Sequence, residues 1–171
     1  MANMFLDLEE IPGESLDLAY LGKIEVHDWN WNMNNDASFS LKSEQAAQQT
    51  KFSHLTVHKK FDLSTPTLMR FCAHGWKIRK GMLVCRKNDG DTKIDYLKIY
   101  LEEIKVQKLD WPAKGGDDSG AVVETVELSF HKVRVEYQLQ QNSGDGLSKE
   151  AGGVNEFPLF NVPNPDKTAG P

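Results

Sequence analysis

The chain has 171 residues, of which 25 are acidic and 20 are basic, giving a net charge of −5. This length fits one domain with a hydrophobic core, and the acidic excess argues against a general attraction to nucleic acid or to an anionic membrane. The two cysteines, Cys72 and Cys85, form no CxxC pair and no zinc-ligand spacing. We expect reduced thiols in a cytosolic protein, with a single disulfide as the alternative.

The N-terminus, MANMFLDLEEIPGES, turns acidic early and lacks the basic start, apolar core and small-residue cleavage site of a secretory signal. No run of the sequence approaches the roughly 18 apolar residues of a membrane helix. We therefore expect no cleavable signal peptide and no membrane insertion. If the protein leaves the cell, another machine must export it.

Alternating apolar and polar residues predict β-strands along most of the chain. Met4, Leu6 and Leu8 share one parity near the N-terminus, and the segment 22–33 carries an unusually aromatic face. Further strands are predicted over 53–61 and 81–87, the second rich in small apolar residues.

Two long strands over 96–111 and 123–139 change parity midway. A half-buried strand shifts its apolar face only with an extra residue or a bend, so these changes indicate strands that bend around a closed barrel. The first apolar set moves from Leu97, Ile99 and Leu101 to Ile104 and Val106, and the second from Val126, Leu128 and Phe130 to Val133, Val135, Tyr137 and Leu139.

One helix is predicted over 65–74. Thr65 is placed as its cap, Pro66 as its first helical residue and Gly75 as the residue that ends it. Leu68, Phe71 and Cys72 follow the spacing of a single apolar stripe, which suits a helix lying on a sheet.

The sequence thus predicts a mainly β fold: a bent antiparallel β-barrel of two packed sheets with one short flanking helix near 65–74. Residues 34–50 are predicted to form a long projecting loop, because structureless loops longer than about 12 to 15 residues are usually functional or disordered. Residues 1–141 form the barrel domain. Residues 142–171 form a tail with a late strand near 156–162 and a disordered end.

Catalysis by Cys72 and His74 is not favoured. Reactive thiolates are stabilised at helix N-termini, whereas Cys72 lies near the C-terminal end of the predicted helix. Residues two apart on a helix also point in different directions. We therefore interpret Cys72 as a packing residue.

Other patterns give no reaction centre. His54 and His58 would lie about 13 Å apart on a strand, too far to share one metal ion. No phosphate-binding glycine loop, GxSxG or HExxH motif occurs, so we expect no enzyme activity, metal or cofactor. A cluster of basic residues is interpreted as a solvated face or a subunit contact, not a nucleic-acid site: Lys77, Arg79, Lys80, Arg86 and Lys87.

Five segments in order resemble the haemolysin-coregulated protein (Hcp) family, the tube subunit of bacterial type VI secretion systems. They are MFLDLEEIPGES, IEVHDWNWNM, LTVHKKFDLSTPTLMRFCAHG and the two long late strands, which together span residues 4 to 140. The family motifs fall on Gly13, Glu14, Ser15, Trp29, Trp31, Asp62, Ser64, Pro66, Leu68, Cys72, Gly75 and Tyr137.

The resemblance implies a six-membered ring that stacks into a tube, and a fold similar to that of phage tail tube proteins. A contractile sheath would drive the tube from the bacterial cytoplasm into the medium or a target cell, with a VgrG-type spike protein at its tip and small effectors in its lumen. The projecting loop would form the ring or stacking contact through Phe39, Leu41, Lys42, Glu44 and Gln48.

Two parts of the sequence depart from the family pattern. The loop reads SLKSEQAAQQ where the family is commonly rich in glycine and serine, and the tail lacks an aromatic-glycine ending. Two other functions stay open on the residues alone: a barrel enzyme whose histidines or carboxylates meet only in three dimensions, and a monomeric module that binds peptide or nucleic acid.

Overall fold

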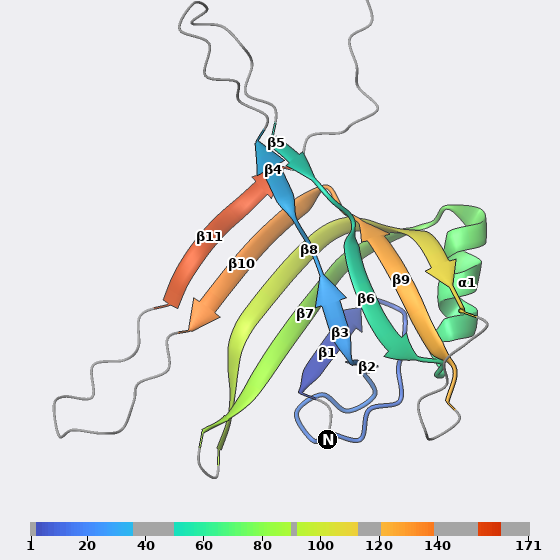
Figure 1. Cartoon of the computed structure of the whole chain (residues 1–171), viewed down its shortest axis with the longest axis horizontal. Helices are drawn as coiled ribbons and strands as arrows, with labels where there is room; N and C mark the ends of the chain where they lie inside the picture. The colour runs from blue at the N-terminus through green and yellow to red at the C-terminus, as the bar shows by residue number, and fades with distance from the viewer. Residues whose placement is uncertain (1–2, 36–49, 90–91, 113–120, 139–153, 162–171) are drawn as a thin grey trace, which may run out of the picture.

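The computed structural model describes residues 3–35, 50–89, 92–112, 121–138 and 154–161 (Figure 1). In these residues it has eleven strands and one helix. In chain order they are β1 (Met4–Leu8), β2 (Ile24–Val26), β3 (Asp28–Asn30), β4 (Met33–Asn35), β5 (Thr50–Phe52), β6 (Leu55–Lys60), α1 (Thr65–His74), β7 (Lys77–Asp89), β8 (Thr92–Asp110), β9 (Val123–Ser129), β10 (Lys132–Gln138) and β11 (Val154–Asn161).

The strands form one large antiparallel sheet and one small one. The large sheet runs β2-β1-β7-β8-β9-β6-β3, with β10 paired to β8 and β11 paired to β10, and the small sheet is β4-β5. The predicted mainly β fold with one flanking helix is confirmed.

Closure of the barrel differs from the prediction, because no hydrogen-bonded ladder joins β2 to β3. The two strands instead follow one another in the chain, so residues 24–30 pair with β1 at one end of the sheet and with β6 at the other. His27 lies between them, and its backbone N–H donates to the oxygen of His58 at 2.8 Å. The sheet therefore bends back on itself and is bridged by the chain.

The parity change in β8 marks the corner of the bent sheet. Glu103 has a φ of +53°, and the strand pairs with β10 before this residue and with β9 after it. On the partner side, the N–H of His131 donates to the oxygen of Glu102 at 3.1 Å, between β9 and β10. Most of the predicted apolar side chains on the two sides of the corner are buried: Ile99, Leu101, Ile104, Val106, Val126, Leu128, Phe130 and Val133. The prediction is wrong at the outer ends of the two sets, because Leu97 and Val135 are only partly buried and Tyr137 is 39% exposed, and Leu139 lies outside the described residues.

Helix α1 covers one side of the sheet, as Figure 1 shows. The predicted cap is wrong by one residue: Ser64 is the N-cap, without a side-chain capping hydrogen bond, and Thr65 is already helical. The Thr65 hydroxyl instead contacts the buried Lys59 amine and donates to Glu124. Gly75 ends the helix as predicted, with a φ of +63° and its N–H on the oxygen of Cys72. Leu68 is fully buried in the core.

Two predicted segments lie partly outside the described residues. β4 and β5 flank residues 36–49, so Phe39, Leu41, Lys42, Glu44 and Gln48 fall in the part that is not described. β11 overlaps the range of the predicted late strand and pairs with β10, which attaches this part of the tail to the large sheet. Among the described helices, none has the length and apolar character to cross a membrane.

Candidate assembly site

The turn between β1 and β2, residues 9–23, holds two motif residues, Gly13 and Ser15. The N–H of Gly13 donates to the oxygen of Gly22 at 2.8 Å, and the N–H of Gly22 donates to the oxygen of Ser15 at 2.8 Å. A Cβ on Gly13 would lie 2.4 Å from the backbone oxygen of Lys23, so only glycine fits there. Ser15 is buried, and its hydroxyl accepts the N–H of Asp17 at 3.2 Å.

The turn is also anchored to the loop that precedes α1. The carboxylate of Glu14 accepts the backbone N–H of Leu63 at 3.3 Å, which joins residues far apart in the sequence. The three motif residues at 13–15 therefore have distinct structural roles: close approach of the backbone, a link to the α1 loop, and a buried hydroxyl.

Asp17 is the ionic anchor of the turn. Its carboxylate contacts the amine of Lys93 at 2.9 Å and the guanidinium of Arg86 at 3.0 Å, and it accepts the N–H of Ala19 at 3.0 Å. The Lys93 hydrogen bond lowers the pKa of this carboxyl, assisted by the Ala19 N–H and the Arg86 charge and opposed by burial. Asp17 therefore stays ionised and holds the turn against β7 and β8.

Tyr20 anchors the turn on its other side. Its ring stacks on that of Phe5 with centroids 4.7 Å apart, and its hydroxyl donates to Asp95 at 2.6 Å. Burial, followed by this hydrogen bond, raises the pKa of Tyr20 well above its usual range. Arg86 lies over the same ring at 5.1 Å and pairs with Asp95 at 2.9 Å. The turn is thus fixed by aromatic and ionic contacts together.

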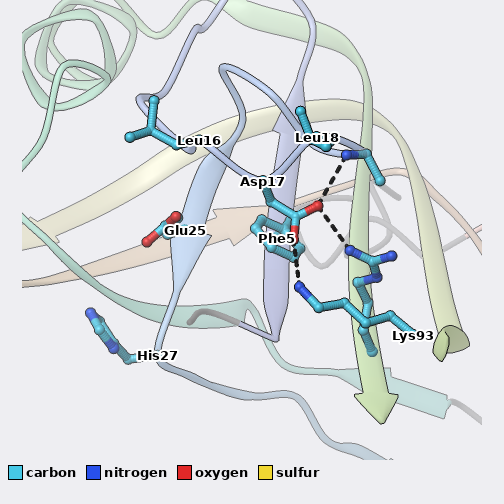
Figure 2. A pocket seen from close by; sticks show the side chains of 9 residues that line it. Phe5, Leu16, Asp17, Leu18, Glu25, His27 and Lys93 are labelled. Carbon is cyan, nitrogen blue, oxygen red and sulfur yellow. Dashed lines mark hydrogen bonds and ion pairs between the residues drawn. The ribbon is translucent and has the colours of Figure 1, made fainter. Parts of the chain in front are cut away.

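The fixed turn presents two leucines to solvent. Leu16 is 84% and Leu18 is 96% exposed. Beside them lies an open groove of about 870 Å³, shown in Figure 2, lined by Phe5, Leu16, Asp17, Leu18, Ala19, Glu25, His27, Arg86 and Lys93. Exposed apolar side chains on a rigid support are typical of protein contact surfaces.

A second motif region, around Asp62 and Ser64, is structural. The Lys59 amine is fully buried and pairs with Asp62 at 2.7 Å and with the buried carboxylate of Glu124. The Thr65 hydroxyl donates to Glu124 at 2.8 Å. Asp62 also accepts hydrogen bonds from the backbone N–H and the hydroxyl of Ser64. This cluster joins the start of α1 to the sheet.

Sequence reasoning missed Lys59 and Glu124, although a signal was present. Lys59 has the same parity as Leu55 and Val57, and Glu124 the same parity as Val126, so each charged residue lies on the buried face of its strand. The two are direct partners across β6 and β9. Opposite charges on the apolar parity of two strands indicate a buried ion pair once the strand pairing is known.

The remaining aromatic motif residues have packing positions. Trp29 and Trp31 are partly buried against the core, and Trp31 stacks on Phe52 with centroids 6.0 Å apart. Tyr137 is 39% exposed and makes an edge contact with Tyr96 at 6.4 Å. None of these three motif side chains lines the groove.

The cysteines are free thiols, so the disulfide alternative is excluded. Cys85 is buried, and burial raises the pKa of its thiol. Cys72 is only partly buried but packs against the core as predicted. The ring of His74 stacks on Trp76 at 4.4 Å, and its Nδ1 lies 2.8 Å from the oxygen of Arg70. Cys72 and His74 therefore both make packing contacts within the chain.

Replacement of Cys72 by alanine is expected to cost about 1 kcal/mol of unfolding free energy, because a small, partly buried side chain is trimmed. Ring formation should be unchanged. Denaturant unfolding and negative-stain electron microscopy measure the two quantities. A folded Cys72→Ala protein that forms no rings would show that the thiol has a role beyond packing.

The charged residues singled out from the sequence are largely paired within the chain. Arg79 pairs with Glu9, and Lys77 lies 3.5 Å from Glu103. His54 lies 3.4 Å from Glu127. In the described part of the chain, no three histidine, cysteine or acidic side chains come together as a metal site. In the basic cluster on β7, Lys77, Arg79 and Arg86 thus have ion-pair partners within the chain.

The comparisons with known proteins agree with one another. The family model described as "Type VI secretion system effector, Hcp" matches residues 5–137. The chain is 32% identical over 152 residues to the protein hcp1 of Pseudomonas aeruginosa, covering 89% of this chain and 91% of that protein. The chain belongs to the Hcp family.

Two solved structures of type VI secretion proteins show the same fold. Hcp1 from Salmonella typhimurium is 29% identical, with a TM-score of 0.73 over 95% of this chain and 96% of that one. A type VI secretion system effector from Yersinia pestis is 25% identical, with a TM-score of 0.69 over 93% of this chain and 99% of that one. The chain is thus a type VI secretion protein of a structural, not an enzymatic, family.

Proposed function

We propose that this chain is the subunit of a type VI secretion inner tube, in which six copies close into a ring and rings stack. The tube is exported from the cytoplasm by contraction of a sheath, with a VgrG-type spike protein at its tip and small effectors in its lumen. The observation that carries the proposal is the Hcp family match over residues 5–137, which includes both the turn and the helix motif.

The surfaces of the described residues support self-assembly. A closed ring and a stack both need contacts between two different patches of the same chain. Leu16 and Leu18 are exposed in the turn that follows β1, and Met33 in β4 is 50% exposed. Figure 1 shows β4 at the opposite end of the molecule from the β1–β2 turn. Contacts of this kind generally bury on the order of 1,200 to 2,000 Å² each.

Negative-stain electron microscopy of the purified chain tests the proposal. Six-fold rings with a central hole are the expected result. Single subunits at high concentration would favour the monomeric binding module instead, and turnover of a substrate would favour the barrel enzyme.

Stacked rings must separate after export, so we expect charged contacts between rings and tubes that shorten as salt rises. The mean tube length at about 0.05 M and about 0.5 M salt gives the comparison, since the Debye length falls severalfold over this range. Rings should persist at both concentrations. Equal tube lengths in the two buffers would contradict a charged stacking contact.

A further inference from the structure

The stretch of residues 63–88 carries no acidic side chain, although the whole chain has a net charge of −5. It includes α1 and most of β7, and its basic residues are Arg70, Lys77, Arg79, Lys80, Arg86 and Lys87. Arg79 and Arg86 form ion pairs with acids from other parts of the chain. Arg70 has no ion-pair partner among the residues that the structure describes. Positive charge is therefore concentrated where α1 ends and β7 begins.

Lys77 in β7 lies directly opposite Lys105 in β8. Like charges at directly opposite positions of an antiparallel pair destabilise the sheet. Both lysines alternate with buried residues, Ile78 and Ile104, so their side chains lie on the outer face of the sheet. Lys105 is partly buried and has no ion-pair partner in the described part of the chain. Lys77 has an exposed contact to Glu103 at 3.5 Å, and such pairs contribute little.

Trp76 precedes Lys77 in the chain and is held in place by α1. The edge of its ring meets Phe71 with centroids 5.5 Å apart, and His74 stacks on it at 4.4 Å. The guanidinium of Arg70 lies 5.8 Å from the centroid of the same ring. Trp76 is nevertheless 43% exposed, and Met69 in α1 is 45% exposed. Tryptophan and arginine are the residue types that contribute most to binding at protein interfaces, and here both are pre-organised.

This surface belongs to neither end of the molecule. Figure 1 shows α1 at the side of the sheet, between the end that carries β4 and β5 and the end formed by the β1–β2 turn. The proposed contacts between copies use those two ends. The side that carries α1 therefore remains for a different protein.

We propose that the surface formed by Met69, Arg70, Trp76, Lys77 and Lys105 docks an acidic amphipathic segment of another protein. Large apolar side chains of that segment pack on Met69 and Trp76, and its carboxylates pair with the three cations. These carboxylates also relieve the repulsion between the two lysines, which is a cost only of the free chain. The inference adds a binding surface to the proposed tube subunit and does not depend on stacking.

The variant Lys105→Glu separates binding from folding, because the two respond to this lysine with opposite signs. The change replaces a like-charge pair by an opposite-charge pair, so the melting temperature is expected to rise by about 1–3 °C. The probe for binding is a labelled amphipathic peptide of leucine, alanine and glutamate, about 18 residues or five helical turns long. Fluorescence anisotropy at low salt is expected to show at least about tenfold weaker binding of this peptide to Lys105→Glu than to wild type.

Three controls make the comparison specific. Lys132→Glu is the same reversal in β10, on the other side of the corner at Glu103, and should bind the peptide as wild type does. Met69→Ser removes an exposed apolar side chain and should weaken binding several-fold at an unchanged melting temperature. A peptide with glutamine in place of every glutamate should not bind to the wild-type protein.

The inference is overturned if wild type does not bind the acidic peptide, or if Lys105→Glu binds it equally well. Loss of rings by a folded Lys105→Glu protein would assign the surface to a contact between copies, which also overturns it. Binding of vesicles of phosphatidylglycerol in place of the peptide would assign the surface to a membrane, with the same consequence. A wild-type chain that binds the peptide but forms no rings would remove the proposed function and leave this inference standing.

Discussion

Replacing Lys59 by methionine is expected to lower the free energy of unfolding by about 3–5 kcal/mol, because removing one partner of a buried ion pair leaves charge without compensation. Lys59 and Glu124 are both fully buried, and Asp62 shares the same amine. Methionine fills a similar volume, so the loss comes from the two carboxylates that no longer face a cation. Denaturant unfolding, followed at more than one wavelength, measures the change.

Two further variants make the comparison specific. Lys23 pairs with Asp7 at 2.8 Å, but both side chains are more than a third exposed, so Lys23→Met should cost less than about 1 kcal/mol. Adding Glu124→Gln to Lys59→Met should recover part of the stability, since one uncompensated charge is removed. Equal losses in Lys59→Met and Lys23→Met would show that the buried cluster does not stabilise the fold.

Alanine at Gly13 is expected to cost about 3 kcal/mol and to abolish stacking. The added Cβ would lie 2.4 Å from the backbone oxygen of Lys23 and 2.5 Å from the nitrogen of Ile24, so backbone must move. This movement of the backbone breaks the hydrogen bond from the Gly13 N–H to the oxygen of Gly22 and displaces the turn that carries Leu16 and Leu18. Thermal unfolding and electron microscopy of the same preparation report the two effects.

Gly22 provides the matched control within the same turn. Its φ is +70°, but a Cβ there meets nothing within 4 Å, so Gly22→Ala should cost only about 1 kcal/mol of left-handed strain. The turn should keep its place and rings should stack. If the Gly13→Ala protein were as stable as the Gly22→Ala protein, a steric clash would not explain the need for glycine at position 13.

The fold was predictable where the signal is local. Alternation through Leu55 and Val57 places a strand, and Gly75 after an apolar stripe ends a helix, because both patterns depend on neighbours in the sequence. The corner at Glu103 was visible for the same reason: a change of parity in one strand requires a bulge or bend. Each of these features follows from residues that are neighbours in the sequence, so no tertiary contact is needed to predict it.

The site was less predictable because its contacts join distant parts of the chain. Asp17 meets Arg86 and Lys93, which lie on other strands, and sequence gives no register for these pairs. The exposed Leu16 and Leu18 resemble ordinary strand residues until Asp17 and Tyr20 are seen to fix the turn outside the sheet. Family motifs marked Gly13, Glu14 and Ser15, but only the structure shows what each one supports.

Native mass spectrometry of the purified wild-type chain over a range of concentrations tests the central claim most directly. The account predicts a dominant species of six subunits in dilute solution, with multiples of six as concentration rises at low salt. A single subunit that persists across the whole range would contradict it.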